Sequence, residues 1–330
     1  MQAFRTVQFV ALGCLTFGSR GFRARKKSFN PTALDIDLTG KHYIVTGGTS
    51  GLGFVTAQQI AERGGTVHIV CRNGAKGETA RSQIVAQSGN DRVQIHVCDI
   101  SSLAQVRRFA DEWRRSGLGI AALVNNAGIL VNERRVSEDG FELSFATNTL
   151  GTFALTEMLL PVLEKSKDAR VITVSSGGML TEGLEVDDFD GKGLSNAKGI
   201  DGSKQYARSK RHQVAMTEHW AEKYKDKGIF WGSMHPGWAK TPGVESSIPE
   251  FYNALKGQFR SAEEGADTIV YMAVAEEVLS LPSGEFFFDR QVVPKHLCAA
   301  GTRYSGTKRE RLLESLEGIL KEKGFALDGQ

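Results

Sequence analysis

The sequence predicts an α/β fold in which a doubly wound parallel sheet of about seven strands forms a single domain. From Asp35 onward, short apolar runs rich in β-branched residues alternate with helical patterns, and no repeat or linker interrupts them. A glycine-rich turn follows the first of these runs. Strands that are apolar on both faces are typical of a parallel sheet covered by helices on each side.

The predicted elements alternate along the chain, and each strand pattern is short and bounded by polar or glycine-containing turns. Strands are predicted at 43–46, 66–71, 93–98, 122–125, 170–175, 229–234 and 285–288. Helices are predicted at 52–63, 75–88, 102–115, 141–164, 203–226 and 262–275.

The composition is that of an ordinary globular protein, and it excludes some partners. Of the 330 residues, 41% are hydrophobic and 24% are charged, and the net charge of +3 is too small to favour nucleic acid. The charge is uneven, because residues 1–34 contain six basic and no acidic side chains. The basic excess therefore belongs to the N-terminal segment, and we expect no nucleic-acid partner.

Residues 1–34 form a basic leader with three open interpretations. A mitochondrial transit peptide, an anchor on a membrane surface, and a disordered or packed arm all fit its basic, acid-free composition. An intracellular location is expected, but mitochondrial or membrane-associated versus cytoplasmic stays open. No apolar run is long enough for an ordinary membrane-spanning helix. The apolar side of the leader would carry Phe4, Val7, Phe9, Val10, Leu12, Leu15 and Phe17.

The main domain is expected at 35–300, followed by an amphipathic helical tail at 301–330. The tail has apolar residues at helical spacing on one face, which would pack either onto its own domain or against a partner, including a second copy of the chain. These residues are Leu312, Leu313, Leu316, Ile319 and Leu320.

The cysteines and histidines do not indicate a metal site. The four cysteines lack C-x-x-C spacing, and Cys71 and Cys98 lie in apolar strand patterns, as expected of buried free thiols. The seven histidines are dispersed along the sequence. We therefore expect neither a disulfide nor a bound metal ion.

The glycine turn at 46–53 predicts a nucleotide site. Gly47, Gly51 and Gly53 lie between a strand and a helix, where glycine permits a tight turn and close approach of a ligand. The start of the following helix offers free N–H groups to a diphosphate. The spacing differs from the common G-x-G-x-x-G pattern, so a purely structural turn is the alternative.

Four further features favour an acid–base site. Tyr206 and Lys210 are four residues apart on one helix, where an ammonium would lower the pKa of the phenol and suit it to proton transfer. The segment 125–128 follows the fourth strand and would line a nucleotide cleft. The serines of segment 174–178 follow the fifth strand and could bind a substrate oxygen. Asn148 interrupts a helical pattern. A surface Tyr–Lys pair and an exposed Asn are the alternatives.

These features occur in the order typical of the short-chain dehydrogenase/reductase family, which the chain resembles over about 40–300. The resemblance implies a Rossmann-type fold and hydride transfer between a nicotinamide cofactor and a carbonyl or alcohol group. It implies Tyr206 as proton donor or acceptor, Lys210 as its partner and ribose ligand, Ser176 as the hydroxyl that polarises the carbonyl, and Asn148 as support for a water relay.

The resemblance also implies contacts to the cofactor. Asp99 and the following Ile100 match the position of an adenine contact, and the segment 235–241 matches a nicotinamide contact. The full set expected at the cofactor is Gly47, Thr49, Ser50, Gly51, Leu52, Gly53, Arg72, Asp99, Ile100, Asn126, Ala127, Gly128, Tyr206, Lys210, Pro236, Gly237 and Thr241.

Arg72 favours NADP(H) over NAD(H). An acidic residue at the end of the second strand would bind the ribose 2′-hydroxyl and repel a 2′-phosphate, but Arg72 stands there instead. A guanidinium can pair with that phosphate. The alternative is an arginine stacked on adenine without preference, which leaves NAD(H) open.

Thirty positions separate Ser176 from Tyr206, more than in many members of the family. The segment 184–200 is expected either to form part of a substrate lid or to be a surface excursion. A retinol-dehydrogenase-like branch also has a longer segment here, which favours a small lipophilic substrate such as a retinoid, steroid or lipid carbonyl. A cofactor-binding sensor and a membrane-associated interaction protein with little turnover are the alternative functions.

Overall fold

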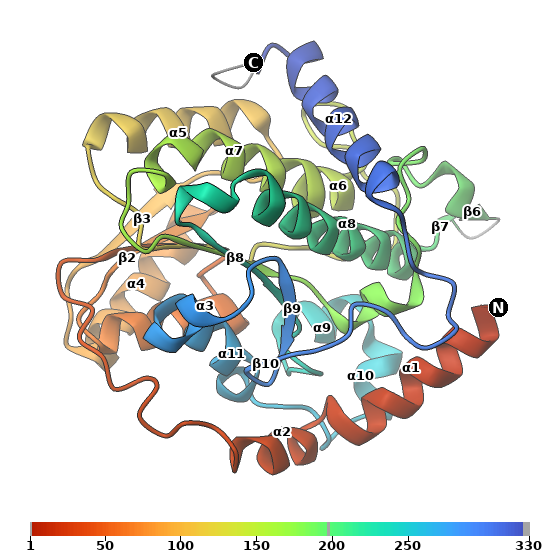
Figure 1. The fold of residues 1–330 in the computed structure, drawn as a ribbon, viewed down its shortest axis with the longest axis horizontal. Helices are drawn as coiled ribbons and strands as arrows, with labels where there is room; N and C mark the ends of the chain where they lie inside the picture. Colours follow the sequence, from red (N-terminus) through yellow and green to blue (C-terminus); the bar gives the residue numbers. More distant parts are fainter. Residues whose placement is uncertain (1, 197–198, 326–330) are drawn as a thin grey trace.

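The computed structural model describes residues 2–196 and 199–325, and its centre is one eight-stranded sheet (Figure 1). The strands of this sheet are β1 (His42–Thr46), β2 (Thr66–Cys71), β3 (Val93–Val97), β4 (Ala122–Asn125), β5 (Arg170–Val174), β8 (Phe230–Met234), β9 (Glu285–Phe288) and β10 (Gln291–Val292). A separate hairpin joins β6 (Ser195–Asn196) and β7 (Gly199–Ile200).

Helices cover both faces of the sheet. The helices α5, α7 and α8 lie on one face, and α3, α4 and α11 lie on the other (Figure 1). The α-helices are α1 (Gln2–Thr16), α2 (Ser19–Lys26), α3 (Gly51–Glu62), α4 (Gly74–Ser88), α5 (Leu103–Ser116), α6 (Leu143–Phe145), α7 (Thr152–Leu163), α8 (Gly202–Lys223), α9 (Pro242–Ser247), α10 (Pro249–Ala254), α11 (Ala262–Val274) and α12 (Gly306–Glu322).

The sheet has the order β10-β9-β8-β5-β4-β1-β2-β3, and all its pairs are parallel except β9 with β10. The chain therefore runs outward from β1 in one direction and from β4 in the other. The prediction of a doubly wound parallel sheet is confirmed, and each of the seven predicted strands is present. The eighth strand, β10, has only two residues, which is too short for a hydrophobic pattern.

The long helix predicted at 141–164 is divided into three parts. Between α6 and α7 lies a π-helical turn, η1 (Ala146–Gly151), which contains Asn148. A Cβ atom at Gly151 would collide with the carbonyl oxygen of Ile100, so only glycine lets this turn approach the end of β3. A π-helical turn inside a helix is frequent at functional sites.

The N-terminal helices are packed against the domain. Phe17 and Phe22 are buried, and Phe17 contacts the rings of His235, Trp238 and Phe288. The buried guanidinium of Arg260 donates hydrogen bonds to the carbonyl oxygens of Thr16 and Phe17 and pairs with Asp289. Within 2–196 and 199–325, no helix has the length and apolar character needed to cross a bilayer.

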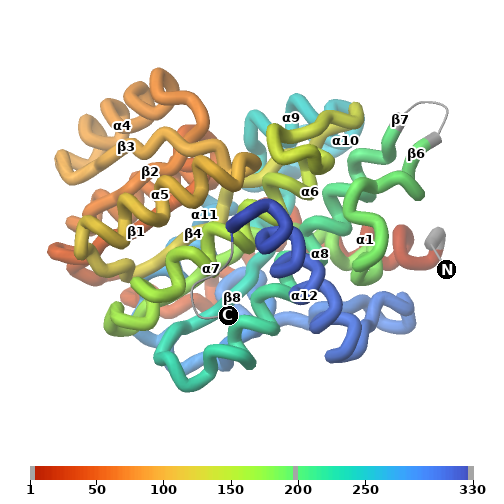
Figure 2. Tube along the Cα trace, turned by 90° about the horizontal axis from the view of Figure 1, so that it is seen from above, coloured from red at the N-terminus to blue at the C-terminus, as the bar shows by residue number. Residues whose placement is uncertain are grey.

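The C-terminal helix α12 packs against α8 (Figure 2). Its apolar face joins the core on the α5–α7–α8 side of the sheet, while Lys223 of α8 pairs with Glu317 at 3.2 Å. The core residues of α12 are Leu312, Leu313, Leu316 and Leu320, and Ile319 packs beside them partly buried.

Three histidines that are far apart in sequence form a row across β1, β2 and β3. His42 Nδ1 lies 3.0 Å from His68 Nε2, and His68 Nδ1 lies 3.0 Å from His96 Nε2. The His68 ring also packs edge-on against Trp113. Burial, aided by the neighbouring histidines, lowers the pKa of His68 to about 3, and burial also lowers the pKa of His42 and His96. At pH 7 the row is therefore neutral in the folded protein.

We expect His68 to make folding sensitive to acid. Its pKa is lowered on folding, so the unfolded chain binds the extra proton, and stability falls as pH drops from about 6.5 toward 3, by at most about 1.4 kcal/mol per pH unit. In His68→Phe, the contribution of His68 to the change of unfolding free energy with pH should disappear. Urea unfolding at pH 7, 6, 5 and 4 measures it, and a stability difference between variant and wild type that does not change with pH would contradict the assignment.

Candidate active site

The predicted site residues converge at the carboxyl ends of the strands, beside the position where the strand order reverses between β1 and β4. In doubly wound sheets, this reversal opens the crevice in which ligands bind. The glycine turn follows β1, Arg72 follows β2, Asp99 and Ile100 follow β3, and Asn126, Ala127 and Gly128 follow β4. Ser176 follows β5, and Pro236, Gly237 and Thr241 follow β8.

The glycine turn has the geometry that its sequence predicts. Gly47 and Gly51 adopt positive φ angles of 67° and 55°, which favour glycine. A Cβ atom at Gly53 would collide with the Asn126 side chain and lie 2.5 Å from the Gly47 carbonyl oxygen. The helix α3 begins without a side-chain cap from Ser50. The N–H groups at the start of α3, which lie between Thr49 and Leu52 in the sequence, are therefore suited to bind a diphosphate.

Hydrogen bonds between Thr46 and Asn126 hold this turn against the end of β4. The Thr46 hydroxyl accepts bonds from the N–H groups of Asn126 and Ala127, at 3.0 and 2.9 Å. The Asn126 amide donates to the Thr46 carbonyl at 2.8 Å and to that of Gly47 at 3.3 Å. Asn126 thus fixes the two sides of the crevice relative to each other.

The segment after β8 closes the crevice from the other side. Gly237 has φ of 76°, and a Cβ atom there would collide with Arg260. Thr241 caps α9 by accepting a bond from Val244, and its methyl group would lie 3.2 Å from a Cβ atom at Gly51. Pro236 and Thr241 are partly exposed. Sequence-distant parts of the predicted cofactor site are therefore neighbours.

Tyr206 and Ser176 meet above the end of β5. The Ser176 hydroxyl is close enough to Tyr206 for their interaction to lower the pKa of the phenol, and it accepts a hydrogen bond from the Gly178 N–H at 3.1 Å. The next N–H group, of Gly177, donates to His235 Nδ1 at 2.8 Å. His235 therefore fixes the turn that carries Ser176, and two hydroxyls are presented together, as carbonyl binding requires.

Lys210 lies one helical turn after Tyr206 on α8 and is almost completely buried, with 3% of its surface exposed. Its ammonium donates to the Val174 carbonyl at 2.8 Å and to Gln213 Oε1 at 3.0 Å. Burial lowers the pKa of Lys210 to about 7. A Cβ atom at Gly128 would lie 3.2 Å from the ammonium, so glycine leaves room beside it.

The expected effect of Lys210 on Tyr206 is wrong for the protein without cofactor. Burial raises the pKa of Tyr206 to about 12, against a smaller lowering by the Ser176 hydrogen bond. The ammonium lies 5.4 Å from the centre of the tyrosine ring, and it donates its hydrogen bonds to Val174 and Gln213 rather than to the phenol. Tyr206 is therefore protonated at neutral pH, which makes it a proton donor.

Asn148 is completely buried, and its side chain braces the neighbouring loop. Its Oδ1 accepts from the Ile129 N–H at 2.8 Å, and its Nδ2 donates to the Ile129 carbonyl and to Ser209. Its main-chain carbonyl accepts a bond from Gln213 Nε2 at 2.8 Å. Gln213 therefore connects Asn148 to Lys210.

Arg72 and Asp99 lie at the adenosine end of the predicted cleft. Arg72 is exposed, and its guanidinium makes no hydrogen bond within the described part of the chain. Asp99 is partly buried, and its Oδ1 accepts two bonds from Ser101, at 2.9 and 2.8 Å. Ile100 is buried beside it. Arg72 is thus available to an anionic ligand.

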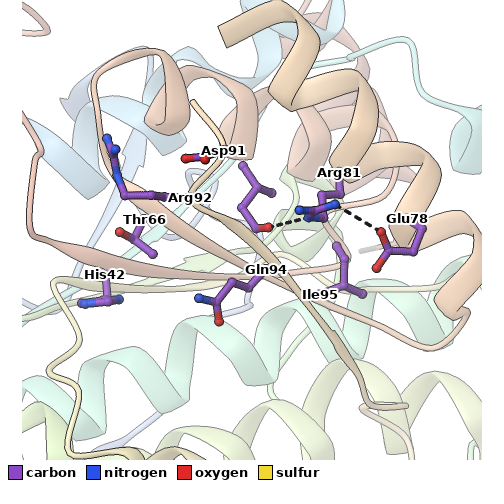
Figure 3. A pocket seen from close by; sticks show the side chains of 9 residues that line it. His42, Thr66, Glu78, Arg81, Asp91, Arg92, Gln94 and Ile95 are labelled. Carbon is purple, nitrogen blue, oxygen red and sulfur yellow. Dashed lines mark hydrogen bonds and ion pairs between the residues drawn. The ribbon is translucent and has the colours of Figure 1, made fainter. Parts of the chain in front are cut away.

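A separate hollow of about 620 Å³ is unrelated to this site (Figure 3). It is lined by residues at the amino ends of β1, β2 and β3, including His42, Thr66 and Val93, at the opposite edge of the sheet. Arg81 crosses it to donate a bond to the Val93 carbonyl and to pair with Glu78 (Figure 3).

Sequence reasoning missed Gln213, and it placed His235 only in the segment 235–241, without its contact to the turn that carries Ser176. Gln213 is three residues after Lys210, so helical spacing alone would place it on the same face. His235 directly precedes the Pro236-Gly237 segment, but its bond to Gly177 depends on a contact between β5 and β8 that no sequence pattern specifies.

Comparison with known proteins agrees with this geometry. Residues 41–185 match the family described as short chain dehydrogenase. Dehydrogenase/reductase SDR family member 12 of Homo sapiens is 43% identical over 97% of this chain and 98% of its own length, and the Bos taurus protein is 42% identical over 97% and 99%. The chain belongs to the short-chain dehydrogenase/reductase family.

A more distant relative and a solved structure are also similar to this chain. Retinol dehydrogenase 12 of Mus musculus is 32% identical over 77% of this chain and 79% of its own. The crystal structure of an uncharacterised protein from Mycobacterium paratuberculosis is 27% identical, with a TM-score of 0.68 over 89% of this chain and 98% of that one. As a family member, the protein is an oxidoreductase that acts on CH–OH or C=O groups with NAD(P), and its fold is the Rossmann type.

Proposed function

We propose that the protein reduces the carbonyl group of a lipophilic substrate with NADPH and that Tyr206 donates the proton. The observation that carries this proposal is the pairing of the Tyr206 and Ser176 hydroxyls beside buried Lys210. Because burial raises the pKa of Tyr206 to about 12, the phenol holds its proton at neutral pH and can act as the acid in the reductive direction.

Each residue of the site has a distinct role in this reduction. NADPH, when bound, supplies the hydride for the carbonyl carbon. The hydroxyls of Ser176 and Tyr206 hold the carbonyl oxygen, and the Tyr206 proton moves to that oxygen as the C=O bond becomes C–OH. Lys210 lies close enough to stabilise the phenolate that is left, and its charge favours that form.

Arg72 supports a preference for NADPH over NADH. It is exposed at the carboxyl end of β2, where a ribose 2′-phosphate would lie in this fold. A guanidinium can bind that phosphate through two parallel hydrogen bonds. An arginine that stacks on adenine without such bonds would give no preference.

Two features support a lipophilic substrate. Relatives at 32–33% identity are named retinol dehydrogenases. The inserted segment between Ser176 and Tyr206 is anchored by buried Leu184 and Val186, and Phe189 stacks on Phe145 at 4.7 Å. We infer that the β6–β7 hairpin of this segment forms part of a substrate lid; residues 197 and 198 at its centre lie outside the described residues.

The N-terminal helices support docking on a membrane surface. Phe9, Leu12 and Phe17 pack inward, whereas Phe4, Val7, Val10 and Leu15 are exposed. Arg20, Arg23, Lys26 and Lys27 are exposed next to this apolar face. Arg5 donates to the carbonyl oxygens of Ala300 and Thr181, so α1 lies against the turn that follows Ser176. We infer that α1 and α2 bind an anionic lipid surface and bring lipophilic substrates near the site.

We predict that Tyr206→Phe lowers the turnover number at least about 100-fold and leaves NADPH affinity largely unchanged, because only the proton-donating hydroxyl is lost. The assay follows NADPH absorbance with all-trans-retinal, a steroid ketone and decanal, with glyceraldehyde as the hydrophilic comparison. Tyr252→Phe, on α10, is the matched control. Wild-type turnover by Tyr206→Phe would refute the assignment.

We predict that Arg72→Asp reverses the cofactor preference. Loss of a charged hydrogen bond to phosphate, together with repulsion, should raise the KM for NADPH by about 10- to 100-fold relative to the KM for NADH. Arg92→Asp, near the amino ends of the strands, is the control. An unchanged ratio of the two KM values in Arg72→Asp would argue against phosphate binding by this residue.

We predict that the protein co-sediments with vesicles containing phosphatidylserine and less with phosphatidylcholine alone. Replacing both Val7 and Leu15 with Glu should lower the bound fraction about tenfold or more, because two exposed apolar side chains can no longer enter the lipid. Val97→Glu, an exposed apolar site on β3, should bind as the wild type does. Equal binding by all three proteins would exclude the leader as the docking surface.

A further inference from the structure

Gln213 is a completely buried amide whose two ends both contact the catalytic centre. Its Nε2 donates to the main-chain carbonyl of Asn148 at 2.8 Å, and its Oε1 accepts from Lys210 Nζ at 3.0 Å. A carbonyl only accepts and an ammonium only donates, so the amide has one orientation that satisfies both neighbours. One turn further along α8, the Thr217 hydroxyl donates to the main-chain carbonyl oxygen of Gln213 at 2.8 Å, not to its side-chain amide.

The other neighbours of Lys210 show why its contact with Gln213 matters. The neighbours of the ammonium are the Val174 carbonyl from β5, Tyr206 and Gln213 from α8, and Gly128 after β4, and Asn148 of η1 is connected to it through Gln213. The titratable group facing it is Tyr206, and burial is the cause of the lowered pKa of Lys210. No carboxylate offsets that burial among these neighbours, so the charged form depends on two amide carbonyl oxygens.

We propose that Gln213 is a positioning residue for the reaction: it holds the Lys210 ammonium in place between β5 and the π-helical turn and keeps it charged. The ammonium uses two of its three N–H donors in its bonds to Val174 and Gln213, and the third can bind another ligand. An uncharged amide does not readily pass on a proton, so the connection from Lys210 to Asn148 is a brace rather than a proton path. This inference rests on the proposed role of Lys210 beside Tyr206.

Two substitutions of nearly equal shape should move the pKa of Lys210 in opposite directions. Gln213→Met removes the acceptor, so the charged form of Lys210 loses a hydrogen bond and its pKa should fall by about one unit. Gln213→Glu places a carboxylate beside the ammonium, so the pKa should rise by about one to three units. A residue that served packing alone would not produce such opposite shifts.

The first test measures the pKa of Lys210 directly, in protein without cofactor. Lysine labelled with ¹³C at Cε gives an NMR signal that follows ionisation, and the signal that is missing in Lys210→Arg identifies the residue. We expect the pKa to increase in the order Gln213→Met, wild type, Gln213→Glu, with Thr217→Val close to wild type. Equal pKa values in all of these proteins would overturn the proposal. Since each variant is compared with wild type separately, a single folded variant is enough to support or overturn it.

The second test is the pH dependence of turnover with NADPH and all-trans-retinal. If charged Lys210 supports the reaction, activity falls as pH rises through its pKa, so this alkaline limb should move to lower pH in Gln213→Met and to higher pH in Gln213→Glu. A profile that stays in place while the pKa moves would refute the role in the reaction. If the proposed function itself is wrong, the result is different: the Tyr206→Phe variant stays active.

Discussion

Hydrogen bonds between Thr46 and Asn126 bridge the crevice on which the site depends. The strand order reverses between β1 and β4, so the crossover connections leave from this point in opposite directions. The Thr46 hydroxyl and the Asn126 amide join the two strand ends through bonds of 2.8 to 3.3 Å. With the crevice fixed, the glycine turn, the Ser176 turn and the segment after β8 can each present groups to one elongated ligand.

The chemistry of the site follows from the burial of its side chains. Burial lowers the pKa of Lys210 and raises that of Tyr206, so both groups resist ionisation in the absence of cofactor. In that state Tyr206 carries the proton that reduction needs, and the lysine charge is stabilised by Val174 and Gln213. The protonation states of Tyr206 and Lys210 therefore depend on burial and on the hydrogen bonds of Lys210, rather than on a direct hydrogen bond between the two side chains.

The sequence predicted the fold well because strands buried on both faces leave continuous apolar runs, and glycines mark the turn after β1. It placed Asn148 in an interrupted helix, and a π-helical turn is present there. It could not predict the row of His42, His68 and His96, because strand register brings together residues more than twenty positions apart. It also predicted a lowered pKa for Tyr206, whereas burial raises that pKa in the protein without cofactor, and the depth of burial of one side chain depends on the whole fold.

A crystal structure with NADPH bound would be the sharpest test, because the proposed chemistry depends on where one cofactor lies relative to these residues. We expect the diphosphate at the Gly47–Gly53 turn, the 2′-phosphate beside Arg72, and the nicotinamide next to Ser176 and Tyr206, within reach of Lys210. A nicotinamide away from Tyr206, or a 2′-phosphate that avoids Arg72, would contradict the proposed function.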